Sequence, residues 1–163
     1  MSATIRWARP DDADHVVRLV KALAAYEHEP EESVRLSADD VRRDGFGEPP
    51  CFEVVLAEWE SEVVGFVLFF PNYSTWEGRP GLYIEDLFVE DRARGHGLGR
   101  RLMAAVAKIA AARGCRRLDL NVLDWNPTRD FYLRLGGRHL AEWLPYRLDA
   151  AAIAALAATA DEL

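Results

Sequence analysis

Three glycines, Gly95, Gly97 and Gly99, alternate within the arginine-rich stretch RGHGLGRR. The stretch follows the apolar run LYIEDLFV and precedes apolar residues that recur at helical spacing from Leu98 onward. Glycine lets the backbone approach a ligand closely, and the start of a helix offers unpaired N–H groups and a positive dipole end. The pattern predicts a loop that holds a diphosphate. An ordinary strand-to-helix turn is the alternative.

Two common phosphate loops do not fit this spacing. A Walker A loop needs Lys followed by Ser or Thr after its last glycine, whereas Arg100 and Arg101 follow Gly99. A dinucleotide-binding loop needs G-x-G-x-x-G, and the sequence has G-x-G-x-G. The spacing therefore indicates a diphosphate site of another class.

Two carboxylates interrupt the apolar run just before the loop. Glu85 and Asp86 are adjacent, so strand alternation predicts that their side chains point to opposite faces. A carboxylate inside such a run is costly unless it is paired or functional. A solvated edge strand is the alternative to a functional role.

The elements that position these residues follow the order β-α-α-β-β-β-α-β-α-β. We expect the strands at residues 4–8, 51–60, 62–70, 81–89, 116–122 and 138–148, the last as one or two closing strands. We expect the helices from residue 10, over 37–46, from 98 to 113, over 126–137 and in the Ala-rich tail 149–163. The order predicts an α+β fold, a mixed sheet with helices packed on it, in a single domain over residues 1–163.

Local signals mark where three of these helices begin or end. Pro10 with two aspartates opens the first, and Ser37 is the expected N-cap of the second, with Gly45 as its stop. Asn126 is the expected cap of the helix over 126–137, with Pro127 at its first helical position.

The spacing R-x-x-G-x-G at Arg94, Gly97 and Gly99 is similar to the acetyl-CoA loop of the GNAT superfamily of N-acetyltransferases. The resemblance covers nearly the whole chain. The ordered blocks LVKALAAYEHEPEE, DGFGEPP, LYIEDLFV, RGHGLG and WNPTRDFYLRLGG resemble the diamine (spermidine/spermine-type) and thialysine acetyltransferase branch. Two departures are the sequence LRL after Tyr132, where that branch carries a basic run, and the short ESE connection near Ser61.

The resemblance implies a mostly antiparallel sheet of six to seven strands, with a splayed strand pair where acetyl-CoA binds. The pantetheine arm is expected along the backbone of Leu87, Phe88 and Val89. The diphosphate is expected on the loop, at Arg94, Gly95, His96, Gly97, Leu98, Gly99 and Arg100. The start of the next helix, at Asn126, Pro127, Thr128 and Arg129, is expected to contact the rest of the cofactor.

The resemblance also implies direct attack of an amine on the thioester. Tyr132 matches a tyrosine that protonates the CoA thiolate, and Glu85 matches a glutamate that helps to deprotonate the amine. By the residues alone, Tyr132 would instead be a buried aromatic of an amphipathic helix. Asp86 is expected to form a structural hydrogen bond or to add negative potential.

The acceptor amine is expected between two acidic segments. Tyr26 and Glu27 match a YE pair at the amine site, and Asp119, Leu120 and Asn121 match positions that line it. A solvated acidic helix end is an equally good interpretation of the segment from Glu27 to Glu32.

Composition narrows the class of ligand. The net charge is −7, which argues against a nucleic-acid surface and favours a cationic small molecule, although the same charge serves solubility. The sequence shows no span long enough for a membrane and no signal peptide. Cys51 and Cys115 are too few for a disulfide framework, and both fit a reducing cytoplasm. The four histidines lack ligand spacing, so no metal is expected.

These observations predict a cytoplasmic, acetyl-CoA-dependent N-acetyltransferase acting on a primary amine of a polyamine, a diamine or a lysine-like amino acid. A homodimer that exchanges its C-terminal strand, EWLPYRL, is implied by the resemblance. Two alternatives remain: a non-catalytic acyl-CoA-binding or regulatory module, and a protein or peptide N-acetyltransferase.

Overall fold

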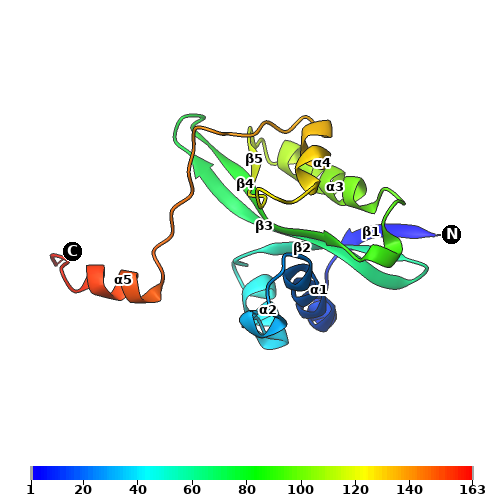
Figure 1. The fold of residues 1–163 in the computed structure, drawn as a ribbon, viewed down its shortest axis with the longest axis horizontal. Helices are drawn as coiled ribbons and strands as arrows, with labels where there is room; N and C mark the ends of the chain where they lie inside the picture. The colour runs from blue at the N-terminus through cyan, green and yellow to red at the C-terminus, as the bar shows by residue number, and fades with distance from the viewer. Residues whose placement is uncertain (1, 163) are drawn as a thin grey trace. The chain divides into compact units, whose positions relative to one another are not determined.

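The structure is a computed structural model that describes residues 2–162. The chain divides into two compact units, residues 1–123 and 124–163. Figure 1 shows the elements of both units with their labels.

The first unit is a five-stranded sheet in the order β1-β2-β3-β4-β5, with helices on both faces. The three neighbouring pairs from β1 to β4 are antiparallel, and β5 runs parallel to β4. Its strands are β1 (Ala3–Trp7), β2 (Glu53–Trp59), β3 (Glu62–Ser74), β4 (Arg79–Val89) and β5 (Leu118–Leu120). Its helices are α1 (Ala13–Tyr26), α2 (Ala38–Phe46) and α3 (Leu98–Ala112), with short 3-10 turns η1 (Pro10–Asp12), η2 (Glu31–Ser33) and η3 (Asp91–Ala93).

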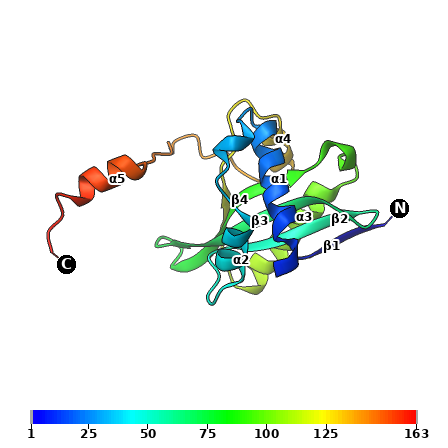
Figure 2. The same cartoon turned by 90° about the horizontal axis from the view of Figure 1, so that it is seen from below.

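Helices α1 and α2 cover one face of the sheet and α3 covers the other (Figures 1 and 2). On α1 the buried side chains recur at helical spacing and pack with Leu56 and Phe66 of the sheet. Their positions are Val16, Leu19 and Leu23. Burying a side chain of this size contributes about 1.5–3 kcal/mol, so this face holds α1 on the sheet.

The second helix confirms its predicted start and corrects its predicted end. The Ser37 side chain accepts a hydrogen bond from the Asp40 amide at 3.1 Å, and the Asp40 carboxylate accepts one from the Ser37 amide at 2.9 Å. The helix runs through Gly45 to Phe46 and is capped by Gly47. Gly45 serves packing instead, because a Cβ there would lie 2.8 Å from the Phe52 ring.

The second unit contains α4 (Thr128–Arg134) and α5 (Ala150–Ala157). The Asn126 Oδ1 accepts a hydrogen bond from the Thr128 amide at 2.9 Å, but the N-cap of α4 is Pro127, so Asn126 lies one residue before the cap position predicted for it. Pro127 precedes the first helical residue, one position earlier than predicted. The tail from Asp149 is helical as expected, and the Asp149 carboxylate accepts a hydrogen bond from the Ala152 amide at 2.8 Å.

The closing strands predicted over residues 138–148 are wrong. These residues form no strand among residues 2–162, which leaves five strands rather than six to seven. A strand needs a neighbouring edge to satisfy its backbone groups, and alternation in sequence cannot supply one. The apolar side chains of this segment stay exposed: Leu140, Trp143, Leu144, Tyr146 and Leu148.

Within residues 2–162, no helix combines the length and the apolar character that crossing a bilayer requires.

Candidate active site

The glycine loop lies between the end of β4 and the start of α3. Gly95 and Gly97 have φ angles of +80° and +74°, and no heavy atom lies within 4 Å of a Cβ placed on either. Gly97 is the N-cap of α3, and the Gly97 carbonyl accepts the first helical hydrogen bond from the Arg101 amide at 3.0 Å. The backbone is therefore open on the side where a ligand would approach the helix start. This geometry fits a diphosphate.

The Arg94 guanidinium contacts protein groups on several sides, so binding a phosphate would not be its only interaction. Its Nε donates to the Val89 carbonyl at 2.9 Å, and its Nη1 is 2.6 Å from the Asp91 carboxylate. The guanidinium carbon also lies 4.7 Å from the centre of the Tyr26 ring and 5.5 Å from that of Phe88. The side chain thus ties the loop to β4 and to the end of α1.

The edge of β4 next to β5 becomes free just before the loop. The parallel ladder has three pairs and ends where Ile84 faces Leu120. Beyond that point, the described part of the chain pairs β4 with β3 only, from Asp86 to Val89. This is the splayed pair that the sequence predicted, and it leaves main-chain groups of β4 open to a ligand. The residues predicted to contact pantetheine lie here: Leu87, Phe88 and Val89.

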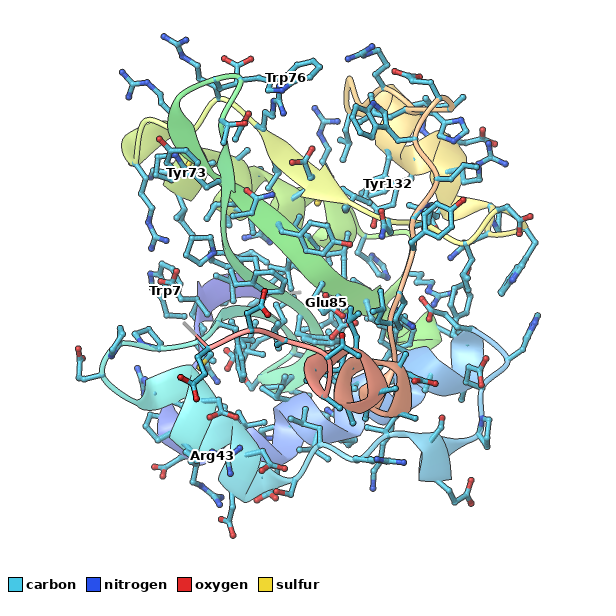
Figure 3. The ribbon with its side chains drawn as sticks, turned by 90° about the vertical axis from the view of Figure 1, so that its left-hand side faces the viewer. Trp7, Arg43, Tyr73, Trp76, Glu85 and Tyr132 are labelled. Atoms are coloured by element: carbon cyan, nitrogen blue, oxygen red, sulfur yellow. The ribbon has the colours of Figure 1, made fainter. Side chains whose placement is uncertain are left out.

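A β-bulge sits at the two strand carboxylates. The register between β3 and β4 shifts so that Leu68 faces Asp86 and Phe69 faces Ile84, which leaves Glu85 without a facing residue. The bulge interrupts the alternation on which opposite faces had been expected for Glu85 and Asp86. Glu85, which is labelled in Figure 3, is exposed, and Asp86 is half-buried.

Among the carboxyl groups of this region, Asp86 has the largest shift in pKa. Burial, followed by the charges of Glu85 and Glu27, raises the pKa of Asp86 to about 7. Burial, followed by the charge of Glu29, also raises the pKa of Glu27. Because the charges of both Glu85 and Glu27 act on Asp86, the end of α1 and the bulge of β4 form one acidic cluster. A cation placed there would relieve both the repulsion and the desolvation.

Tyr26 completes this cluster from α1. Its ring centre is 6.1 Å from that of Phe88, at an angle of 52°. Because Arg94 lies over both rings, Tyr26 is the residue at which the acidic cluster meets the glycine loop.

The residues at the end of β5 that were predicted to line the acceptor site differ from one another in their surroundings. Asp119 faces Tyr83 of β4, and its Oδ2 accepts a hydrogen bond from Asn72 at 3.3 Å. The Asn72 side chain crosses β4 at Gly81, where a Cβ would lie 2.7 Å from its Oδ1. Asn121 is exposed beyond the end of β5, and Leu120 is half-buried within it.

Tyr132 belongs to the second unit, on α4. Its ring is half-buried and makes an edge contact with Phe131 at 5.2 Å between centres. The Tyr132 carbonyl accepts hydrogen bonds from Leu135 and Gly137, so the tyrosine sits where α4 is fastened to the following turn. At the start of α4, Asn126 is buried and Arg129 donates to the Asp124 carbonyl at 2.8 Å.

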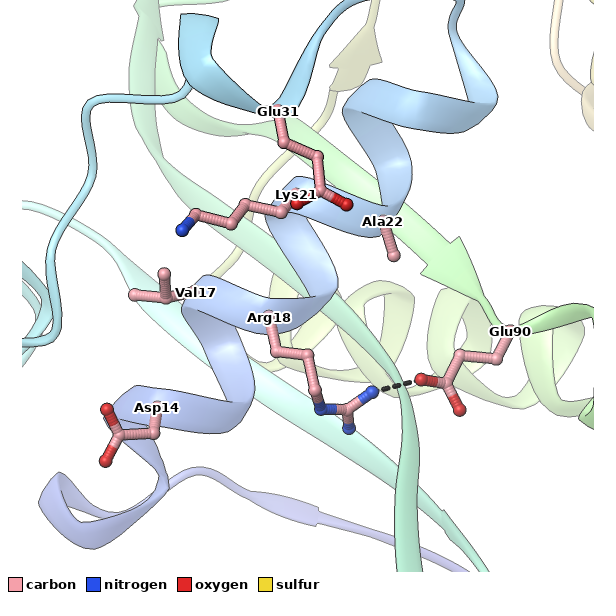
Figure 4. A pocket seen from close by; sticks show the side chains of 7 residues that line it. All are labelled: Asp14, Val17, Arg18, Lys21, Ala22, Glu31 and Glu90. Atoms are coloured by element: carbon pink, nitrogen blue, oxygen red, sulfur yellow. Dashed lines mark hydrogen bonds and ion pairs between the residues drawn. The ribbon is translucent and has the colours of Figure 1, made fainter.

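A hollow of about 410 Å³ on the outer side of α1 contains none of the predicted site residues. Figure 4 shows two cationic and three acidic side chains lining it, with the ion pair between Arg18 and Glu90. Charges of both signs line the hollow, so it offers an amine no net attraction comparable to the acidic cluster. The Arg18 ion pair joins α1 to the residue that follows β4.

Comparison with known proteins decides the family. The profile of the "Acetyltransferase (GNAT) family" matches residues 5–137, which is most of the chain. The chain belongs to the GNAT acetyltransferase family. The enzymes of this family use acetyl-CoA as co-substrate, and the chain is accordingly an N-acetyltransferase.

Individual relatives agree with this assignment. The chain is 38% identical to thialysine N-epsilon-acetyltransferase of Bos taurus over 94% of this chain and 96% of that one. It is 32% identical to human spermidine/spermine N(1)-acetyltransferase-like protein 1 over 84% of this chain and 21% of that much longer protein. An integron cassette protein from the mobile metagenome of V. cholerae superposes with a TM-score of 0.79 at 28% identity, over 96% of this chain and 98% of that one.

Sequence reasoning missed two features of the site. It did not predict that Asp86 rather than Glu85 would have the strongly raised pKa. The alternation of residue types along the strand does not reveal the bulge. It also gave no side-chain partner for His96, whose ring stacks on Trp59. Among residues 2–162, no group of three or more His, Cys, Asp and Glu side chains is arranged to hold a metal.

Proposed function

We propose that the enzyme acetylates a primary amine of a small cationic molecule: a polyamine, a diamine or a lysine-like amino acid. The observation that carries this proposal is the acidic cluster of Glu27, Glu85 and Asp86, joined by Tyr26, beside the open edge of β4. Relatives named for thialysine and for spermidine or spermine support the same class of acceptor.

The cofactor would be held mainly by main-chain groups. The amides from Arg94 to Arg100 face the diphosphate, and the free edge at Leu87, Phe88 and Val89 faces the pantetheine arm. We assign Asn126, Pro127, Thr128 and Arg129 to the remaining contacts with the cofactor. Acetyl-CoA supplies a thioester whose carbonyl carbon is open to nucleophilic attack.

The chemistry needs two protons removed from the nitrogen and one supplied to the sulfur. Glu85, exposed at the bulge, accepts the first proton from the ammonium group directly or through water. The neutral amine then attacks the thioester carbonyl, so that a C–N bond forms and the C–S bond breaks, and the nitrogen releases its second proton to solvent. The Tyr132 hydroxyl gives its proton to the departing thiolate, and its phenolate recovers one from solvent.

The acceptor is selected by charge. Asp86 and Glu27 are costly to ionise in the empty cluster, and a bound cation lowers that cost. The protein therefore gains more from a cationic acceptor than from a neutral one, and repels an anionic one. Asp119, Leu120 and Asn121, at the end of β5, would line the far part of the same site.

A thiol-release assay with acetyl-CoA and a panel of amines tests this function. Turnover with spermidine, a short diamine, thialysine or lysine, and none with an anionic amine such as glutamate, would support it. Cofactor binding without turnover for any amine would instead indicate a non-catalytic acyl-CoA-binding module. Turnover only with peptides would indicate a peptide N-acetyltransferase.

We also propose that the protein is a cytoplasmic homodimer. Its two cysteines are free thiols, as a reducing compartment allows. The segment 138–148 exposes apolar side chains in irregular chain, with Trp143 at 65% and Tyr146 at 90% exposure. Pairing with a second copy would give this segment the strand partner that it lacks. Light scattering should give twice the chain mass, and a monomer would contradict the proposal.

A further inference from the structure

The exposed part of the glycine loop is short and fastened at its ends. Ala93, before it, and Leu98, after it, are almost fully buried. Between them, residues 94–97 are exposed, and two of the four are glycines with positive φ. Such a segment loses much conformational freedom when it becomes ordered around a ligand. Contacts that hold it in place beforehand would strengthen binding.

The two side chains of this segment are both turned toward aromatic rings. Arg94 is held on the Tyr26 side. His96 stacks on Trp59, with 4.1 Å between ring centres and 24° between ring planes. An aromatic stack of this geometry is a direct attraction between side chains that are 37 residues apart in sequence (96 − 59).

Trp59 is a firm support for that stack. It is the last residue of β2 and pairs with Ala3 of β1 and with Glu62 of β3, so strands on both sides fix its backbone. The following turn is tight, because Glu60 and Ser61 both have positive φ and lead directly into β3. The sheet therefore presents the Trp59 ring at a fixed place beside the loop.

We propose that Trp59 is a positioning residue for cofactor binding, acting through the ring of His96. The stack fastens the middle of the loop, at the residue between Gly95 and Gly97, and keeps the neighbouring amides directed outward. The proposal rests on the proposed function, in which those amides bind the diphosphate of CoA. It assigns the His96 side chain to the protein rather than to the phosphates.

Calorimetric titration of CoA into four variants tests the proposal. Trp59→Ala and His96→Ala should each raise the Kd of CoA by about two- to tenfold, the range of one aromatic pair. The double variant should be no weaker than the weaker single one, because both changes remove the same contact. His96→Phe keeps a ring on Trp59 and should restore most of the affinity.

The kinetic signature separates positioning from damage to the fold. The KM for acetyl-CoA should rise while kcat stays the same. With S-acetylpantetheine, which has no diphosphate, kcat/KM should be equal in the wild type, Trp59→Ala and His96→Ala. Trp7→Ala is the matched control, because Trp7 lies on the same sheet and contacts Phe69, at 6.2 Å between ring centres, instead of the loop.

Three results distinguish the outcomes. An unchanged Kd of CoA in His96→Ala would overturn the positioning role, and so would an equal loss with S-acetylpantetheine. His96 is exposed, so its variant should fold even if Trp59→Ala does not. Absence of CoA binding in the wild type would instead refute the proposed function itself.

Discussion

The glycine loop and the acidic cluster differ in the groups that they offer to a ligand. The loop offers main-chain amides, and its two glycines with positive φ keep side chains out of the ligand's space. The cluster offers side chains from the end of α1 and from a bulge in β4, and burial is the main cause that raises the pKa of two of its carboxyls, Asp86 and Glu27. Main-chain amides at fixed positions match a ligand group of fixed geometry, such as a diphosphate. Charge attraction depends less on shape, so an acidic cluster can bind amines of different lengths. Substitutions should therefore act on the loop through backbone shape and on the cluster through protonation.

The largest effect is expected at Gly97. Gly97→Val forces a β-branched residue to a φ of +74° and places methyl groups where the phosphates would lie. CoA affinity should fall by about 100-fold or more, since strain and overlap act together. Calorimetric titration of CoA into the variant and the wild type measures this loss of affinity.

Gly78→Val is the control for strain alone. Gly78 also has a positive φ, +62°, with open space around it, in the turn between β3 and β4. It should lose stability without losing CoA affinity. Equal loss of affinity in both variants, or in neither, would refute the loop assignment.

The next largest effect is expected at Tyr132. Tyr132→Phe removes only the proton donor, so kcat should fall by about 10²–10⁴-fold while the Kd of CoA stays nearly the same. Tyr73→Phe, at an exposed tyrosine of β3, should leave both values unchanged. A wild-type kcat in Tyr132→Phe would remove the phenol from the mechanism.

Glu85 should matter for the amine and not for the cofactor. Glu85→Gln should lower kcat/KM for the amine by about 10- to 100-fold, because the proton acceptor at the bulge is lost. Glu60→Gln, at an exposed turn glutamate, serves as the matched control. If the CoA affinity fell in Glu85→Gln instead, the division between the two regions would be wrong.

The smallest effect is a pH-dependent one at Asp86. Because its folded pKa is raised to about 7, ionising Asp86 costs stability as pH rises from about 4 through 7. Asp86→Asn should match the wild type near pH 4 and exceed it by about 1–3 kcal/mol at pH 8. Urea unfolding across this pH range measures the difference, and a difference independent of pH would contradict the burial argument.

Sequence reasoning succeeded where the signal is local. The R-x-x-G-x-G spacing located the loop and the Ser37 box marked the start of α2, because each depends on neighbours within a few residues. Asn126 marked the start of α4 to within one residue, since the N-cap there is Pro127. The sequence also predicted the splayed strands, through resemblance. The antiparallel hairpin of β2 and β3 followed from two β-rich runs around a short turn.

It failed where distant segments decide the outcome. The bulge at Glu85 depends on how β3 and β4 register, and no alternation of residue types records that shift. The pKa of Asp86 depends first on burial, then on Glu85 and on Glu27, and Glu27 follows α1, 59 positions away (86 − 27). The apolar alternation of residues 138–148 is real, but the described chain gives it no strand to pair with.

A crystal structure with CoA and a diamine tests the central claim most directly. The account predicts the diphosphate against the amides of Gly95 to Arg100, the pantetheine arm along the free edge of β4, and an amine nitrogen among Glu27, Glu85 and Asp86. A diphosphate bound elsewhere, with those amides facing solvent, would contradict it.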